Sequence, residues 1–161
     1  MKKKIIITQI ILFLIGAIIY PCIELIYKAG NTHWTMALVG GIALTTVIDV
    51  NIIFKKVPLI FRAIVATLSV TLIELISGLI INKWLQLKVW DYTNSPYNIC
   101  GQICLKFSIY WFLLCTTVII LFELGYFIIN KIKHKKNNVN IVEIPKNNRQ
   151  KKKISISSNC N

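Results

Sequence analysis

The sequence is poor in acidic residues. It has 6 Asp and Glu residues against 19 Lys and Arg residues in 161, which gives a formal net charge of +13. Only 16% of the residues are charged while 55% are hydrophobic, and the apolar residues form long unbroken blocks. A soluble domain would instead spread its apolar residues at helix or strand periods, so this composition favours a membrane protein over a soluble globular one.

Several motifs that carry chemistry are also missing from the sequence. It contains no C-x-x-C redox motif, no Cys and His set with zinc-ligand spacing, and no G-x-x-x-x-G-K-[ST] phosphate loop. Cys100 and Cys104 are therefore interpreted as small, buried packing residues. We predict that the chain is not an enzyme and that it needs neither a cofactor nor a metal.

Four apolar blocks are long enough to cross a membrane as helices. At a rise of about 1.5 Å per residue, each block can span a hydrocarbon core of about 30 Å. The first block follows a basic start but precedes no small-x-small cleavage site, so it is interpreted as a retained span and not as a signal peptide. The predicted fold class is an all-α membrane protein with transmembrane helices at residues 5–27, 35–54, 57–82 and 105–130.

The distribution of Lys and Arg predicts the orientation of these helices. With the N-terminus inside, residues 2–4, the short hinge at residues 54–58 and the basic end of the chain all face the cytoplasm. This arrangement follows the positive-inside rule and places both termini in the cytoplasm. Residues 1–130 then form the transmembrane domain, and residues 131–161, rich in Lys and Asn, form a disordered cytoplasmic tail that is not expected to bind nucleic acid.

Four of the six acidic residues lie inside the apolar blocks, one in each block. An ionisable side chain in hydrocarbon costs about 2.5–3.5 kcal/mol on insertion scales, so it usually faces the bundle interior and often marks function. Glu24 and Glu74 lie toward the outer ends of their blocks, whereas Asp49 and Glu123 lie in the inner halves of theirs. Small and polar residues recur at helical spacing on one face of each block, which predicts that these faces contact protein and not lipid. The four faces contain Gly16, Tyr20 and Glu24; Gly41, Thr45 and Asp49; Thr67, Thr71, Glu74 and Gly78; and Cys104, Ser108, Trp111 and Cys115.

The first and third blocks share a short motif as well as a depth. The sequence IELI occurs at residues 23–26 and again at residues 73–76, and Trp34 and Trp84 each follow the Glu by ten positions. This similarity suggests the remnant of a duplicated helical hairpin, which would form a parallel repeat. The hypothesis requires that Glu24 and Glu74 lie close together in the folded protein.

The outer loop between the third and fourth blocks has an unusual composition. Its Trp and Tyr residues fit an aromatic belt at the membrane interface. Asp91, Asn98 and Gln102 are concentrated in the same segment, and residues 94–96, Asn-Ser-Pro, are a turn signal. Two interpretations stay open: a passive interfacial loop, or a lid that folds over the mouth of the bundle above the outer acids.

Residues 90–114, WDYTNSPYNICGQICLKFSIYWFLL, combine WDY, P-x-N and GQIC at fixed spacing. This string resembles the signature of the CmpB-like family of ABC-transporter type IV membrane proteins, and the resemblance covers about residues 10–130. It implies a small multi-pass protein of a bacterial cell membrane that acts as a permease subunit. Outside the string, the resemblance rests on Glu24, Lys28, Gly30, His33, Trp34, Gly40, Gly41, Glu74, Leu75, Ile76, Gly78 and Asn82.

Two functions are carried forward from the sequence. In the first, the chain is a permease subunit that moves a small solute or ion, and its membrane acids handle a proton or cation. Four spans are few for a complete pathway, so this function requires a homo-oligomer or separate transporter subunits that include an ATPase. In the second, the chain is a structural or regulatory partner whose acids only make hydrogen bonds between helices. A membrane enzyme that uses His33, Asp91 and Glu24 for acid/base chemistry is disfavoured, because the sequence shows no nucleophile–base spacing, metal set or cofactor motif. The candidate pathway or binding residues are Glu24, His33, Trp34, Glu74, Trp90, Asp91, Tyr92, Asn98, Gln102 and Trp111.

Overall fold

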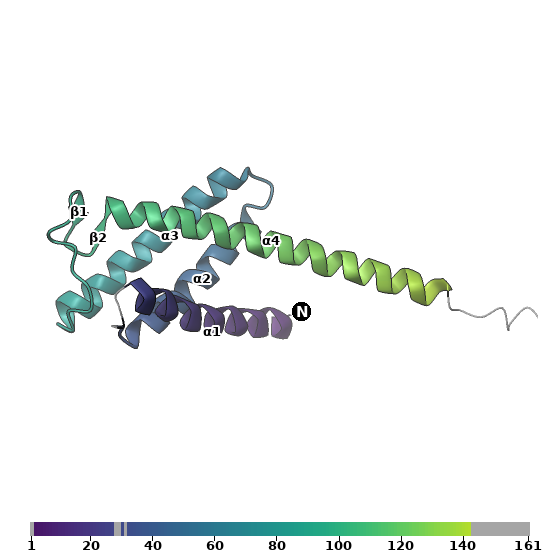
Figure 1. The fold of residues 1–161 in the computed structure, drawn as a ribbon, viewed down its shortest axis with the longest axis horizontal. Coiled ribbons are helices and arrows are strands. Elements are labelled where there is room, and N and C mark those ends of the chain that lie inside the picture. The colour runs from purple at the N-terminus through teal and green to yellow at the C-terminus, as the bar shows by residue number, and fades with distance from the viewer. Residues whose placement is uncertain (1, 28–29, 31, 143–161) are drawn as a thin grey trace, which may run out of the picture. The chain divides into compact units, whose positions relative to one another are not determined.

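The computed structural model describes residues 2–27, 30 and 32–142, and these residues are almost entirely helical (Figure 1). In chain order the elements are α1 (Lys2–Tyr27), α2 (Thr35–Ile53), α3 (Leu59–Gly78), the π-helix η1 (Leu79–Trp84), β1 (Asn98–Ile99), β2 (Ile103–Cys104) and α4 (Leu105–Val142). Four segments are long and apolar enough to cross a membrane: Lys3–Tyr27, Thr35–Ile53, Leu59–Trp84 and Leu105–Lys135. The prediction of an all-helical chain with four such helices is confirmed.

Several observed helix ends differ from the predicted ones: α1 begins at Lys2, α2 ends at Ile53 and η1 ends at Trp84. The third helix begins at Leu59, and not at residue 57, because Pro58 has a non-helical backbone with φ −53° and ψ 148°. The fourth helix continues to Val142, so residues 131–142, expected to belong to a disordered tail, are helical. The remainder of that predicted tail, residues 143–161, lies outside the described residues. The chain divides into two compact units, residues 1–122 and residues 123–161.

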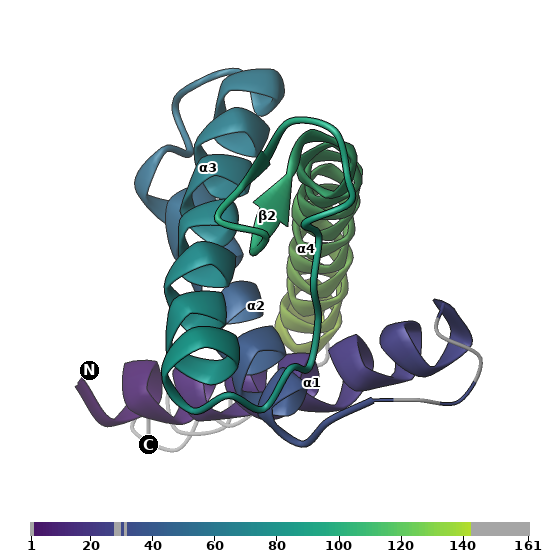
Figure 2. The same cartoon turned by 90° about the vertical axis from the view of Figure 1, so that its left-hand side faces the viewer.

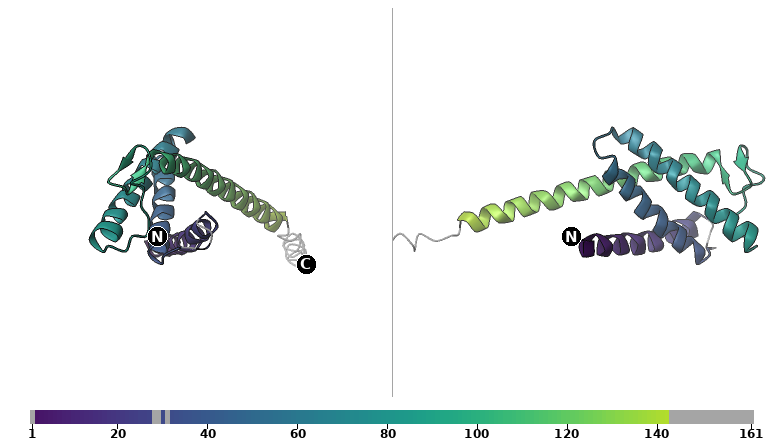
Figure 3. Two further views of the ribbon diagram at one scale, coloured as in Figure 1. Left: turned by 60° about the vertical axis from the view of Figure 1, so that its left-hand side comes forward. Right: turned by 180° about the vertical axis from the view of Figure 1, so that it is seen from behind.

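Within the first unit, α1 packs directly against α2, and Figures 1 and 3 show the chain turning back between them. The two backbones approach closely at a pair of glycines. A Cβ atom added to Gly16 would lie 2.5 Å from the carbonyl oxygen of Gly40, and one added to Gly40 would collide with Tyr20. Glycine at these positions therefore permits the contact, as small residues do at many membrane helix interfaces.

The apolar core of the first unit is formed by one face each of α2, α3 and α4. The side chains from α2 and α3 are small, and α4 supplies the larger ones, so the three helices interlock at this face. The predicted inner faces are buried in part. The buried members are Gly16, Glu24, Gly41, Thr67, Glu74, Gly78, Cys104, Trp111 and Cys115, whereas Tyr20, Thr45, Asp49, Thr71 and Ser108 are half-buried. The buried core residues are Ala43, Val47, Val50, Ala63, Ala66, Val70, Trp111, Cys115 and Ile119.

The loop after η1 ends in a small antiparallel hairpin, which Figure 2 shows next to α3. Asn98 pairs with Cys104 and Ile99 pairs with Ile103. The sequence analysis missed this hairpin because each strand has only two residues, too few for a visible alternation of polar and apolar positions. Cys104 is buried as expected, but the prediction for Cys100 is wrong, because this residue lies exposed in the turn with φ 54°.

We expect Gly40→Ala to destabilise the first unit. The new methyl group would overlap Tyr20 and the Gly16 carbonyl, so α1 must move away from α2 at a cost of about 1–3 kcal/mol. The midpoint of thermal unfolding in detergent should fall. Gly125→Ala is the matched control, because a Cβ atom there would meet nothing within 4 Å and alanine favours a helix. An unchanged midpoint for Gly40→Ala would contradict the close packing of α1 on α2.

Candidate functional site

A cavity of about 560 Å³ lies in the first unit between α1, α3, α4 and the segment that follows η1. Half of its lining residues are aromatic, and three acidic residues, Glu24, Glu74 and Asp91, also line it. No Lys, Arg or His side chain contributes to the lining as far as the described residues extend. The cavity therefore combines acidic groups with large ring surfaces. The aromatic lining residues are Tyr20, Tyr27, Trp90, Tyr92, Phe107, Tyr110 and Trp111.

Glu74 is the most firmly held acid of this cavity. It lies on the inner face of α3 and is only 5% exposed. Its Oε2 atom accepts a hydrogen bond of 2.8 Å from the Trp111 indole N–H of α4. Its Oε1 atom accepts a longer one of 3.4 Å from the Tyr92 hydroxyl group. Glu74 is thus oriented by two neutral aromatic donors that come from different elements.

Glu24 reaches the same cavity from α1. It is 7% exposed, and its Oε2 atom accepts a hydrogen bond of 2.5 Å from the hydroxyl group of Thr32. Because Glu24 and Glu74 line one cavity, the proximity that the repeat hypothesis requires is met, while the duplication itself stays a prediction. Lys28, which the family resemblance adds near Glu24, lies outside the described residues.

Aromatic contacts connect α1 to α4 across the cavity. The rings of Tyr20 and Trp111 are stacked, with centroids 5.4 Å apart and an interplanar angle of 7°. Phe107 stacks on Tyr92 at 4.5 Å and meets Tyr27 edge-on at 5.9 Å. Such ring pairs contribute about 0.5–1.5 kcal/mol each beyond their buried area, so they help to fix the cavity wall.

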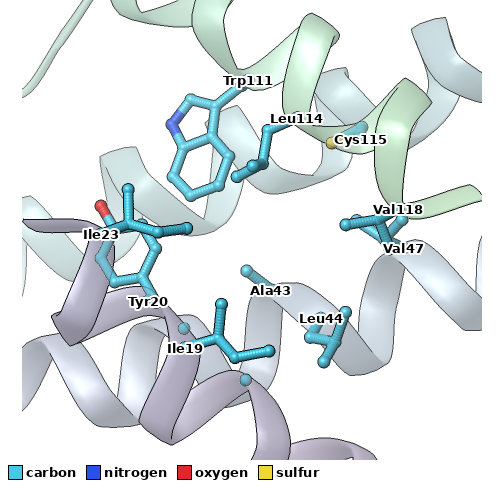
Figure 4. Close-up of a pocket in the computed structure, with 12 residues that line it drawn as sticks. Ile19, Tyr20, Ile23, Ala43, Leu44, Val47, Trp111, Leu114, Cys115 and Val118 are labelled. Carbon is cyan, nitrogen blue, oxygen red and sulfur yellow. The ribbon is translucent and has the colours of Figure 1, made fainter. Parts of the chain in front are cut away.

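A smaller apolar pocket of about 90 Å³ adjoins this cavity (Figure 4). Its lining comes from α1, α2 and α4, and Figure 4 shows Ala43, Leu44 and Val47 facing it from α2. Tyr20, Ile23, Trp111 and Leu114 line both spaces. The larger cavity therefore has an acidic side, at Glu24 and Glu74, and an apolar side toward α2.

Gln102 attaches the hairpin to the helices. Its side chain is 2% exposed, and its Oε1 atom accepts a 2.8 Å hydrogen bond from the Asn82 side chain of η1. The Trp90 indole N–H donates to the Gln102 backbone carbonyl at 3.1 Å. Gly78 makes room for this side chain, because a Cβ atom there would lie 2.5 Å from the Gln102 Oε1 atom. Gln102 therefore acts as a support behind the cavity wall.

Asp91 and Asn98 hold the loop together internally. The Asp91 carboxylate accepts hydrogen bonds from the backbone N–H of Thr93, at 2.9 Å, and from its hydroxyl group. These bonds lower the pKa of Asp91 below its usual value, because they favour the charged form. Asn98 donates its side-chain amide to the carbonyls of Thr93 and Ser95. Burial, with Glu74 nearby, raises the pKa of the Tyr92 phenol, so Tyr92 remains a hydrogen-bond donor.

Six of the ten candidate residues line the cavity and the other four do not. His33 lies at the start of α2, where its Nδ1 atom is 2.9 Å from the Thr35 hydroxyl group, and Trp34 is 68% exposed. Asn98 and Gln102 belong to the hairpin and do not line the cavity. The candidate residues that line it are Glu24, Glu74, Trp90, Asp91, Tyr92 and Trp111.

Four aromatic residues of the cavity were missing from the candidates. Tyr20 had been placed on the inner face of its helix, one turn from Glu24, but it was not taken as a site residue. Phe107 lies one turn before Trp111, so its helical spacing was an available signal, whereas Tyr110 directly precedes Trp111 and lacks that spacing. Tyr27 offered no such signal. The described residues contain no group of three or more His, Cys, Asp and Glu side chains that could hold a metal ion.

We expect acid to loosen the loop around Asp91. Because its pKa is lower in the folded loop than in the unfolded chain, Asp91 stabilises the fold above the usual carboxyl pKa of about 3.9 and loses this effect as the pH falls through that range. The hydrogen-exchange protection of the Thr93 amide should fall below about pH 4. Asp91→Asn should remove this pH dependence. Equal pH profiles for the two proteins would contradict the role of the Asp91 carboxylate.

We expect Gln102→Ala to detach the hairpin from α3 and η1. The change removes a buried acceptor from Asn82 and leaves a void beside Gly78, at a cost of about 1–3 kcal/mol. Hydrogen exchange should then rise for residues 89–104 more than for α2. A matched control is Gln86→Ala, because Gln86 lies in the exposed part of the loop. Equal protection in the two variants would show that Gln102 does not anchor the hairpin.

A comparison with known proteins identifies the family of this chain. The family described as "Putative ABC-transporter type IV" (CmpB) has a model that matches residues 11–144. No curated protein and no solved structure is significantly similar to the chain. The matched region includes every residue that lines the cavity. The chain therefore belongs to the CmpB family of ABC-transporter type IV membrane proteins.

Proposed function

We propose that the protein is the membrane subunit of an ABC-type transport system and that it binds a small solute in the 560 Å³ cavity. The observation that carries this proposal is Glu74, a buried carboxyl group in a cavity of ligand size. Two neutral donors, the Trp111 indole N–H and the Tyr92 hydroxyl group, orient it. Ligand sites are typically concave and mostly apolar, with a few placed polar groups. The acidic and aromatic lining fits this description.

The orientation and partners belong to the same proposal. The positive-inside rule places both termini in the cytoplasm and the cavity with its hairpin toward the outer side. The chain has no phosphate loop, so ATP hydrolysis would come from a separate subunit, and the four spans would be completed by a partner or by further copies. We also propose that the chain itself catalyses no reaction.

One observation favours a second candidate function. The hydrogen bonds of Glu74 join α3, α4 and the loop, which is also what a purely structural acid would do. In that case the protein is a structural or regulatory membrane partner without a solute site. A substitution of Glu74 by glutamine distinguishes the two functions, because glutamine can still accept a hydrogen bond but carries no charge. A purely structural role should tolerate this change, whereas a solute site that needs the charge should not.

We expect Glu74→Gln to weaken solute binding while the fold is kept. Full-length protein in uncharged detergent would be screened by thermal shift against cationic, anionic and neutral solutes, since a bound solute raises the unfolding midpoint. The solute that stabilises the wild type most should give a clearly smaller shift with Glu74→Gln, and cells carrying this variant should take up less of the same radiolabelled solute.

Asp49→Asn is the matched control for this experiment. Asp49 is also a membrane acid, but its partner is the Gln9 side chain at 2.6 Å and it does not line the cavity. It should behave like the wild type in binding and uptake. If no solute shifts the midpoint of the wild type, and Glu74→Gln leaves the cells unaffected, the structural alternative is correct.

A further inference from the structure

We propose that the solute is a bulky organic cation of the quaternary or tertiary ammonium class, held against the aromatic rings beside Glu74. This proposal rests on the proposed function, because it names the chemistry of the same cavity. Three features of the cavity lead to it: the sign of its charged groups, the number of aromatic rings in its lining, and its large volume compared with its few polar groups.

The charged groups of the lining are all acidic. Glu24, Glu74 and Asp91 contribute carboxyl groups, and the described lining contains no basic side chain. A positively charged solute is attracted to such a cavity, because the buried carboxyl groups of Glu24 and Glu74 are withdrawn from water and interact more strongly with a cation than an exposed one such as Asp91 does. A phosphate, a carboxylate or the headgroup of a phospholipid would instead place a negative group next to Glu24 and Glu74, where the described lining offers no basic side chain; Lys83 acts on Asp91 but does not line the cavity.

The aromatic residues supply the second feature. Seven of the fourteen lining residues are Tyr, Trp or Phe. The polar edges of Trp111 and Tyr92 are directed to Glu74, so their hydrogen-bonding groups are already occupied by the protein. One face of Trp111 is stacked on Tyr20 and one face of Tyr92 on Phe107, so each ring can offer a solute only its other π face. Such faces attract cations and are the usual means of binding quaternary ammonium groups.

The size of the cavity favours an organic cation over an inorganic one. A hard metal ion such as Ca²⁺ requires six to eight oxygen ligands at short distance. The cavity has a volume of about 560 Å³, and the described residues form no cluster of three metal-binding side chains. An ammonium ion with alkyl substituents is weakly hydrated and large, so it needs one carboxylate and several rings instead of an oxygen cage.

The test compares three probes that share a hexyl chain and differ only in the head group. Hexyltrimethylammonium is cationic, hexyl glucoside is uncharged and hexyl sulfate is anionic. Each would be titrated by calorimetry into full-length protein in dodecyl maltoside, with empty micelles as the blank. We expect the cation to bind at least about tenfold more tightly than the glucoside, and the sulfate not to bind.

Two variants probe the two parts of the site separately. Glu74→Gln should weaken binding of the cation about tenfold or more and leave the glucoside unchanged. Phe107→Leu keeps an apolar side chain but removes a ring, and it should weaken only the cation, by about fivefold. The controls are Asp49→Asn and Phe61→Leu, because neither residue lines the cavity. Circular dichroism and the unfolding midpoint establish that each variant is folded.

Three results would overturn the assignment. The first is equal affinity for hexyltrimethylammonium and hexyl glucoside, and the second is a folded Glu74→Gln variant that binds the cation as the wild type does. Either result would leave the cavity as a solute site of another class, so the proposed function would survive. The third is the absence of heat with all three probes, which overturns the cation assignment. If the broader solute screen were also negative, the proposed function would fall as well.

Discussion

The hydrogen bond between Glu74 and Trp111 is the contact on which the rest of the site depends. It joins α3 to α4 at 2.8 Å, and the same indole ring stacks on Tyr20 of α1. Through the Tyr92 hydroxyl group, Glu74 also contacts the loop that lines the cavity. One buried carboxyl group on α3 thus bonds to α4 and to the loop, and its burial away from water makes each of these hydrogen bonds costly to leave unmade.

The loop between η1 and α4 has a different task from the cavity wall. Gln102 and Asn98 use their hydrogen-bonding capacity on Asn82 and on the loop backbone, so they are supports and do not line the cavity. The π-helix η1 directs Asn82 toward both Gln102 and the Val89 backbone N–H. Segments of π-helix often occur at functional sites, where they redirect side chains that an α-helix would place elsewhere. Trp90, Asp91 and Tyr92 are held next to the acids by this support.

The sequence was a good guide to the helices and a partial guide to the site. Long apolar blocks predict spanning helices without any tertiary information, and the inner faces followed from the spacing of small and polar residues. Glu24, Glu74 and Trp111 were found because polar groups in apolar blocks are rare and therefore conspicuous. Phe107 and Tyr110 were missed because an aromatic residue in a membrane helix is equally suited to lipid contact, and only packing distinguishes the two environments.

What the sequence determined by itself is the class of the protein: four helices with apolar surfaces and one acid in each apolar block. These properties are local, because length, hydropathy and helical periodicity depend only on neighbouring residues. The tertiary structure alone decided which acids meet. It placed Glu24 and Glu74 in the lining of one cavity and paired Asp49 with Gln9, and it directed Gln102 to Asn82 and not into that cavity. Such contacts depend on the packing of helices and on the path of a loop, which no spacing along the chain specifies.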